Sequence, residues 1–344
     1  MHRNHRNTSV TLEQFLNRFD GVERSLVVVN RTDPDPVLNM LADTFGEGSV
    51  AVTDGSLAGD AGTGSRRFDA GTGSERDDAR PDGAGVAGEE GLSADGLTRR
   101  SADAGEGPVI DVDALRRNDA VPFDGDDPSS VENLALLVEG DEVVAGSTLG
   151  ELGDTVLFVN SDLYITGTRS LDEVDLPAVI SRLSDTTFTL RGYPESNRQK
   201  LLLITISRFI ERAACVAGDG TLRASFQRLS RLNDEVGTRQ VYERVADVGV
   251  DMHLYGVPDD VPRDLDAVVH GGDNRDFTRS WFVVYRPPEG PRSVADKAGS
   301  DLERGIEGGV GLLAVEARPR VWRGTWTFDE TRVRELNRYI ERNL

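Results

Sequence analysis

Cysteine, lysine and histidine are all scarce in this sequence. Cys215 is the only cysteine, Lys200 and Lys297 are the only lysines, and there are 4 histidines. A single cysteine excludes an intrachain disulfide, and a structural zinc site with four close Cys or His ligands is not expected. We predict Cys215 to be a packed, unreactive thiol. No metal site and no catalytic grouping is predicted, and the sequence identifies no cofactor.

Long apolar runs are also missing. The longest, Leu201–Ile206, is too short to cross a bilayer. The N-terminal residues 1–10 contain no apolar segment of the kind that a secretory signal needs. Together with the single cysteine, these absences predict a cytoplasmic protein without membrane insertion.

Acidic side chains dominate the charge. The formal net charge is −21, and almost all basic residues are arginine. Such a surface suits a cytoplasm of very high salt, where screening weakens self-repulsion, so we expect a halophilic, haloarchaeal protein. The alternative is an ordinary acidic protein with a codon bias toward arginine. In either case the charge disfavours a nucleic-acid partner, which needs a basic face.

Apolar spacing in the first fifty residues predicts a small βαβ-like unit. Thr11 can cap a helix with Leu12, Phe15, Leu16 and Phe19 on one face and Gly21 as its stop. The later segments are a strand, a helix and a second strand, at Ser25–Asn30, Pro36–Phe45 and Ser49–Thr53.

The composition changes between residues 54 and 107. Gly, Ala, Asp, Ser and Arg prevail there, and the motif DAGTGS occurs at residues 60–65 and again at 69–74. Its Gly-x-Gly pairs resemble a phosphate loop, but no strand enters them and no GK[ST] follows. Because the stretch buries little apolar surface, we predict a disordered insertion.

The remainder of the chain alternates between strands and helices. We predict a hairpin around Gly140, a long helix over Glu195–Ala217, and a final helix from Asp329. Leu222–Leu232 fits either a helix or a strand. The other predicted strands are Thr155–Asn160, Leu163–Thr166, Val250–Tyr255, Trp281–Tyr285, Val310–Glu316 and Val321–Thr327, and the other predicted helices are Asp172–Leu183 and one capped by Thr238.

These elements indicate an α/β protein of mixed α+β type, with mixed sheets and packed helices. We expect an N-terminal unit (1–53), the insertion (54–107), a further α/β region (108–190) and a C-terminal domain (191–344) that begins near the long helix. The βαβ-like segments 25–53 and 221–256 suggest a remote internal duplication.

Aromatic residues supply the candidate ligand site. Trp322 and Trp326 are four residues apart in a strand, so both fall on one face. If the aromatic strands share a sheet, their rings could hold a flat ligand; ordinary core packing is the alternative. The candidate ligand-binding residues are Phe226, Gln227, Tyr242, His253, Tyr255, Trp281, Trp322 and Trp326.

Residues 190–344 resemble the DICT sensory domain, a family named after diguanylate cyclases and two-component systems. The resemblance is carried by the segment Thr221–Asp260, the motifs WFVVY and GVGLLAVEARP, and the closing WRGTWTFDETRVRELNRYI. It implies a non-catalytic sensory module, with a suspected link to light response, that acts through a signalling protein partner because no output segment is recognisable.

Two alternatives remain. One is an enzyme of unfamiliar type on a nucleotide-like ligand, which would depend on His253 or His270. The other is a structural protein that forms a homodimer through the long helix, with Leu202 and Phe209 in the contact.

Overall fold

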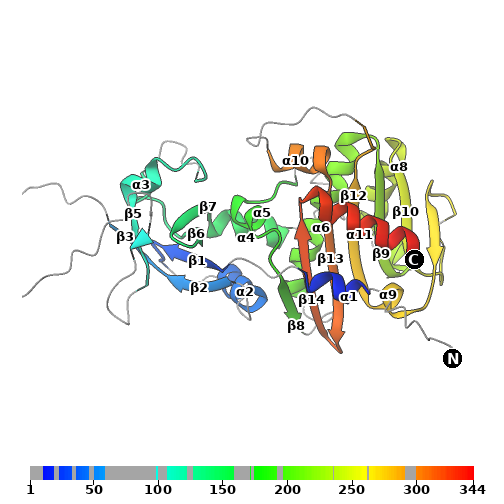
Figure 1. Ribbon diagram of the computed structural model, residues 1–344, viewed down its shortest axis with the longest axis horizontal. Helices are drawn as coiled ribbons and strands as arrows, with labels where there is room; N and C mark the ends of the chain where they lie inside the picture. The colour runs from blue at the N-terminus through cyan, green and yellow to red at the C-terminus, as the bar shows by residue number, and fades with distance from the viewer. Residues whose placement is uncertain are drawn as a thin grey trace, which may run out of the picture.

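The computed structural model describes residues 11–18, 23–32, 36–45, 50–58, 98–99, 107–121, 127–158, 171, 174–191, 197–234, 236–261, 263–290 and 300–344. Within these ranges the chain forms one four-stranded, one seven-stranded and one three-stranded sheet. Figure 1 shows the four-stranded and seven-stranded sheets side by side along the long axis of the molecule. The predicted mixed α/β class is confirmed.

The four-stranded sheet has the order β2-β1-β6-β7. β1 (Arg24–Val29) and β2 (Val50–Asp54) run parallel and are joined by α2 (Pro36–Phe45), as the βαβ pattern predicted. β6 (Leu134–Glu139) and β7 (Glu142–Thr148) form the predicted hairpin. Its turn places Gly140 at a φ of 64°, a conformation that glycine adopts without steric cost.

A three-stranded sheet extends this end of the molecule. β3 (Ser56–Ala58) and β4 (Thr98–Arg99) both pair with β5 (Val109–Asp111), which leads into α3 (Val112–Arg116). β3 and β4 fall inside the insertion predicted for residues 54–107, so those bounds were too wide. The repeated DAGTGS motifs lie outside the described residues.

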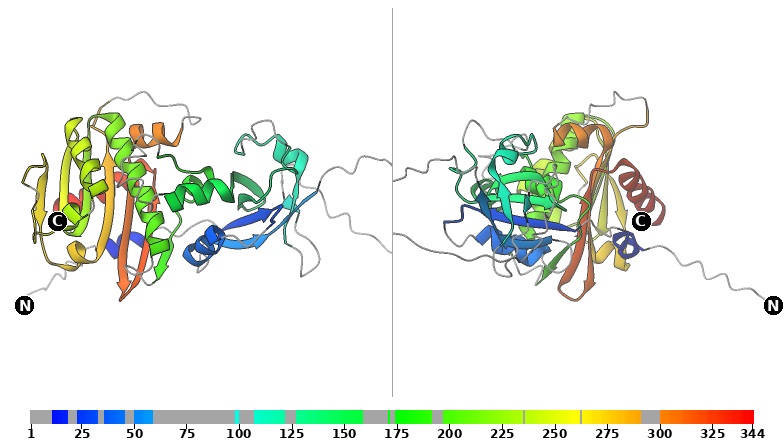
Figure 2. Two further views of the ribbon diagram at one scale, coloured as in Figure 1. Left: turned by 180° about the vertical axis from the view of Figure 1, so that it is seen from behind. Right: turned by 60° about the vertical axis from the view of Figure 1, so that its left-hand side comes forward.

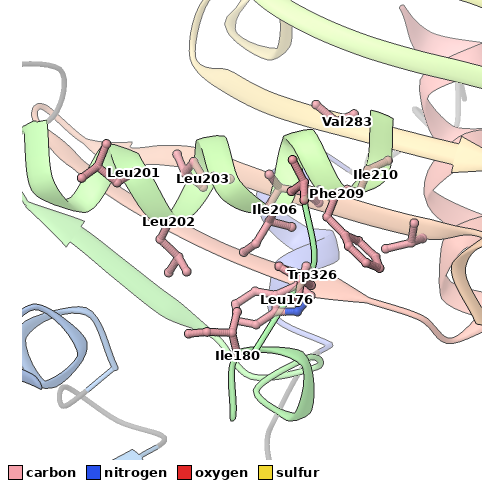
Figure 3. Packing of buried hydrophobic residues seen from close by; sticks show 14 of the residues in the cluster. Leu176, Ile180, Leu201, Leu202, Leu203, Ile206, Phe209, Ile210, Val283 and Trp326 are labelled. Carbon is pink, nitrogen blue, oxygen red and sulfur yellow. The ribbon is translucent and has the colours of Figure 1, made fainter. Parts of the chain in front are cut away.

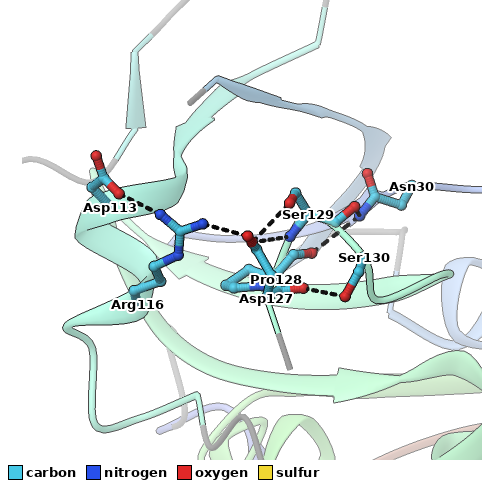
Figure 4. Close-up of polar contacts among 7 residues, drawn as sticks. All are labelled: Asn30, Asp113, Arg116, Asp127, Pro128, Ser129 and Ser130. Atoms are coloured by element: carbon cyan, nitrogen blue, oxygen red, sulfur yellow. Dashed lines mark hydrogen bonds and ion pairs between the residues drawn. The ribbon is translucent and has the colours of Figure 1, made fainter. Parts of the chain in front are cut away.

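A group of polar contacts holds the segment before β6 (Figure 4). The Asn30 side-chain amide donates to the carbonyl of Val131 at 2.8 Å, and the Asp127 carboxylate accepts from the hydroxyl of Ser129 at 2.7 Å. The bonds from Ser129, and then the ion pair with Arg116, lower the pKa of Asp127. These contacts explain how the turn before β6 is fixed, and we assign no ligand site to them.

Two segments after β7 differ from the prediction. Residues Leu149–Phe158 form helix α4, although Thr155–Asn160 was predicted to be a strand. The Thr148 hydroxyl accepts from the backbone N–H of Glu151, which caps the helix, and the apolar run then continues in it. α5 (Ala178–Arg182) is shorter than the predicted helix because Pro177 is its N-cap. The strand predicted at Leu163–Thr166 lies outside the described residues.

The seven-stranded sheet has the order β11-β10-β9-β12-β13-β14-β8. The first three strands are parallel and the rest are antiparallel to their neighbours. Their bounds are Phe188–Arg191 (β8), Thr221–Arg228 (β9), Asp251–Val257 (β10), Val268–Gly271 (β11), Ser280–Arg286 (β12), Val310–Arg318 (β13) and Val321–Thr327 (β14). The ambiguous stretch 222–232 is thus mostly strand, followed by the short helix α7 (Arg231–Asp234).

Helices cover both faces of this sheet (Figure 2). One face packs against α6 (Asn197–Ala217), α8 (Val236–Asp247) and α10 (Asp301–Gly308). The other face packs against α1 (Leu12–Leu16), α9 (Arg275–Thr278) and α11 (Glu330–Asn343). We call these the α6 face and the α11 face. The cap predicted at Thr11 is confirmed, and the final helix predicted from Asp329 forms with that residue as its N-cap. α8 begins at Val236, before the predicted cap Thr238.

The largest core lies around α6 and extends into the four-stranded sheet (Figure 3). Leu202 and Phe209 are fully buried, and Cys215 lies in the same core. Phe45 of α2 contacts Trp326 of β14 with ring centroids 6.1 Å apart, so both sheets share one apolar interior. No helix in the described part of the chain has the length and apolar character to span a bilayer.

Two Gly→Ala variants test this packing. A Cβ at Gly324 would lie 2.4 Å from Phe188 Cζ and 2.8 Å from the Leu313 carbonyl oxygen, whereas at Gly150 the nearest atom is 3.8 Å away. In denaturant unfolding we expect Gly324→Ala to lose about 1–3 kcal/mol through overpacking. The matched change Gly150→Ala, in the first turn of α4, should be neutral or gain about 0.5 kcal/mol. Equal stabilities for both variants would contradict this packing.

Candidate functional site

The predicted ligand residues fall on both faces of the seven-stranded sheet. Trp322 and Trp326 share the α6 face, as their spacing predicted, but are 4 % and 0 % exposed. Tyr255 belongs to the core of the α11 face, and His253 alternates onto the same side of β10. The predicted residues therefore do not line one common surface. Phe226, Gln227, Tyr242 and Trp281 do come together, and we call them the β9-end cluster.

A β-bulge creates this cluster. Ser225 pairs with Tyr255, but the next residue of β10, Gly256, pairs with Gln227, so Phe226 is the extra residue. Gln227 has a φ of 58°, which is unfavourable for a residue other than glycine, and costs about 1 kcal/mol or more. Two hydrogen bonds hold its side chain: it donates to the Ser280 carbonyl at 3.3 Å and accepts from Arg231 at 2.6 Å. Bulges of this kind often redirect a side chain at a functional site.

The bulge places two partly exposed rings near each other. The Ser225 hydroxyl accepts from the backbone N–H of Phe282 at 2.8 Å, and Gln227 bonds to Ser280. These bonds flank Phe226 on β9 and Trp281 on β12, which are both partly buried against the α6-face core. The Phe226 ring also meets Tyr242 edge to face, with centroids 5.1 Å apart.

A buried ion pair lies beside the rings. Arg208 and Glu211, one turn apart on α6, are 2.6 Å apart, and both are buried. Glu211 also accepts from the Tyr242 hydroxyl at 2.9 Å, while Arg208 donates to the Thr238 hydroxyl at 2.7 Å. Burial, and then the negative charge of Glu211, raise the pKa of Tyr242, so the phenol stays protonated. The network joins α6 to α8 beneath the cluster.

The loops that follow the parallel strands β9 and β10 lie at the same edge of the sheet as the β9-end cluster. The Asp259 carboxylate after β10 accepts from the backbone N–H of Ser230 at 3.0 Å and from its hydroxyl at 2.9 Å. Arg228 pairs with the same carboxylate at 3.1 Å. These contacts, with the Ser230 N–H first, hold the pKa of Asp259 well below its ordinary range. The acidic pair Asp259-Asp260 therefore joins the loop after β10 to the segment after β9.

A second polar group lies on the α11 face, and we call it the histidine pair. Nδ1 of His253 is 2.9 Å from Nε2 of His270, and Nε2 of His253 is 3.1 Å from a carboxylate oxygen of Asp251. The His270 ring stacks on Tyr255, with centroids 4.4 Å apart. The buried Arg223 donates to the Tyr255 hydroxyl at 2.7 Å. Burial, then the charges of His253 and Arg223, lower the pKa of His270.

Sequence reasoning missed Arg208, Glu211 and Arg223. Arg208 and Glu211 interrupt an apolar helix face three residues apart, and that pattern was the available signal. No local sequence pattern pointed to Arg223, because its hydrogen-bond partner Asn337 is far away in the sequence. In the described part of the chain, no group of three or more His, Cys, Asp or Glu side chains is placed to hold a metal ion.

No protein-family model, curated protein or solved structure matches this chain. The resemblance to the DICT family therefore stays a prediction.

The buried network of Arg208, Glu211 and Tyr242 predicts that the variant Tyr242→Phe is less stable than the wild type. This change removes the donor to Glu211 and leaves a buried carboxylate oxygen unpaired, so we expect a loss of about 1–3 kcal/mol in unfolding free energy. The matched variant Tyr339→Phe removes a hydroxyl that donates to the partly exposed Asp276. Because water can replace it, the loss there should stay below about 1 kcal/mol. A larger loss in Tyr339→Phe would contradict the role of the buried network.

The histidine pair predicts a contribution of His270 to acid sensitivity. The folded chain binds the His270 proton less readily than the unfolded chain, whose ordinary pKa is 6.5. The stability that neutral His270 contributes to the folded chain is therefore present above pH 6.5. It is lost as the pH falls through the lower pKa of the folded chain. We expect His270→Gln to reduce the fall in melting temperature between neutral and acidic pH. The neighbouring variant Val268→Ala should keep the full fall, and equal falls in both would contradict the assignment.

Proposed function

We propose that this chain is a non-catalytic sensory or signal-transduction module that binds a small planar ligand at the β9-end cluster. The observation that carries the proposal is the bulge at Phe226 and Gln227. Backbone strain at a residue that is not glycine persists only where its surroundings enforce it, and such strain concentrates at functional sites. Here Arg231 and Ser280 enforce it.

The position of the cluster in the sheet supports a ligand site. In open sheets with parallel strands, ligands bind in the crevice beyond the carboxyl ends of those strands. β9 ends there, with parallel β10 on one side and antiparallel β12 on the other. Phe226 and Trp281 offer partly exposed rings at this edge, and the paired Arg208 and Glu211 make the base rigid. Aromatic rings of this kind favour a flat, stackable ligand.

The proposed output is through a separate signalling partner in a salt-rich cytoplasm, in environmental or light response. The long helix is not a suitable homodimer contact, because the described part of α6 places Leu202 and Phe209 wholly in the chain's own core. A dimer through these side chains would require that core to open. A homodimer through another surface stays a prediction.

The enzyme alternative is less well supported by the geometry. It depended on His253 or His270, and these side chains bind each other on the α11 face. Phe226 and Trp281 pack on the α6 face, with the sheet between the two groups. A ligand held by the aromatic rings would therefore be separated from both histidines, so a nucleotide stacked there would have neither as its general base.

The test compares two Phe→Leu variants. The purified protein would first be examined by absorption spectrum and intact mass for a retained ligand, then titrated with a flavin and a purine nucleotide as planar probes. Phe226→Leu should weaken binding about tenfold or more, since stacking on one ring is worth about 1–3 kcal/mol. Quenching of Trp281 emission reports binding, because Trp322 and Trp326 are buried.

Phe277→Leu is the matched control. Phe277 is buried on the α11 face, so this variant makes the same chemical change away from the cluster. We expect it to bind the probe with wild-type affinity. If both variants bind equally well, or if the wild type retains and binds no planar molecule, the ligand proposal is wrong.

A further inference from the structure

The histidine pair has hydrogen bonds that fix where its protons sit. A carboxylate accepts hydrogen bonds and donates none, so the Asp251 contact requires a proton on Nε2 of His253. In the neutral pair, Nδ1 of His253 is then an acceptor, and the contact of 2.9 Å requires a proton on Nε2 of His270. Nδ1 of His270 keeps its lone pair.

A first added proton fits this arrangement. It can bind at Nδ1 of His270 without breaking either hydrogen bond. When the Nε2 proton of His270 crosses to Nδ1 of His253, the positive charge moves beside the Asp251 carboxylate, and His270 becomes the neutral Nδ1–H form. One proton is thus shared by two rings, and a negative charge 3.1 Å away stabilises it.

A second proton does not fit. Both rings would then carry N–H groups at the contact of 2.9 Å, with no acceptor between them and two like charges in contact. Arg223 of β9 adds a third positive charge beneath, and burial further opposes ionisation of His270. The other charged or titratable groups around the pair are Asp251 and Tyr255 of β10 and Glu341 of α11, which lies 3.9 Å from Arg223.

The strand that carries His270 is weakly held. β11 has 4 residues and lies at the edge of the sheet, where in the described part of the chain it pairs, in parallel, with β10 alone. Val268 is 48 % exposed, so the strand's apolar contact with the core comes from the partly buried Val269. The side chains that hold it are His270, which bonds to His253 and stacks on Tyr255, and Val269, which packs partly buried against the α6-face core. Loss of the hydrogen bond between His270 and His253 would remove much of the side-chain contact that holds β11 on the sheet.

We propose that His253 and His270 form a proton-binding site that holds one shared proton, and that a second proton breaks their hydrogen bond and releases the edge strand β11. Release would uncover Tyr255, whose hydroxyl binds Arg223, and Arg223 in turn donates to Asn337 of α11 at 2.9 Å. The site therefore links acidity to the contact between the sheet and α11. It needs no ligand at the β9-end cluster, so its failure and the failure of the ligand proposal are separate results.

The experiment is NMR of the full chain with ¹⁵N-labelled histidine, in which His2→Gln and His5→Gln leave only the pair visible. At high pH both rings should carry their proton on Nε2. On acidification one proton should be taken up by the pair, and the second at least about one pH unit lower. Below the second step the β11 amides should open at least about tenfold more often in hydrogen exchange, while β13 amides stay protected.

The control is His253→Gln, which keeps a hydrogen-bonding side chain without a charge. His270 should then titrate as a single group, at a higher pH than the second step of the wild-type pair, because the repulsion from His253 is gone. In this variant, hydrogen exchange of the β11 amides should show no increase at acidic pH. The proposal is overturned if the two histidines of the parent protein titrate independently within about half a pH unit, or if His253→Gln keeps the acid-induced opening.

Discussion

Helix α6 is buried on nearly all sides, and its buried side chains set the positions of the elements packed around it. This helix lies between the seven-stranded sheet and the helices α4, α8 and α10. It brings Arg208 and Glu211 into the core, where an unpaired charge would cost several kcal/mol. Tyr242 and Thr238 must therefore face them, and this requirement fixes how α8 sits on α6. The β9–α8–β10 unit is positioned as a result.

β9 connects the two proposed sites through a single strand. Arg223, near its start, faces Tyr255 and α11, whereas Phe226, at the bulge, faces Tyr242 and α6. The bulge lies at the register shift between Tyr255 and Gly256, so a change on the histidine side adjoins the strained backbone of Gln227. Binding of a ligand at the β9-end cluster and of a proton at the histidine pair would then be coupled if β9 has two arrangements and each event favours one of them.

The turn between α5 and β8 joins the two large sheets. Arg24 of β1 donates to the Ser184 carbonyl at 2.9 Å and to the Thr186 hydroxyl at 2.7 Å. Arg332 of α11 pairs with Asp185 in the same turn at 2.6 Å. Together with the contact between Phe45 and Trp326, these bonds give the four-stranded sheet a direct connection to α11, the helix that the histidine pair also reaches through Arg223.

Local pattern was sufficient for most elements of the fold. Spacing and turn chemistry, which act within a few residues, predicted strand Val321–Thr327, the hairpin at Gly140, the cap at Thr11, the final helix and both parallel βαβ units. The same reasoning predicted a strand where α4 forms, because a short apolar run fits either structure. β8 and β11 were missed, since their few residues are strands only by virtue of distant partners.

Composition and apolar spacing were enough to predict the mixed α/β class and to single out Phe226, Gln227, Tyr242 and Trp281. Strand pairing in the folded chain then brings these four side chains together and places Tyr255 and His253 on the other face of the sheet. Folding also buries Trp322 and Trp326 in the core, pairs Arg208 with Glu211 and sets Arg223 against Tyr255. The physical reason is that alternation fixes which residues of one strand share a face, but pairing between strands far apart in sequence fixes which faces coincide.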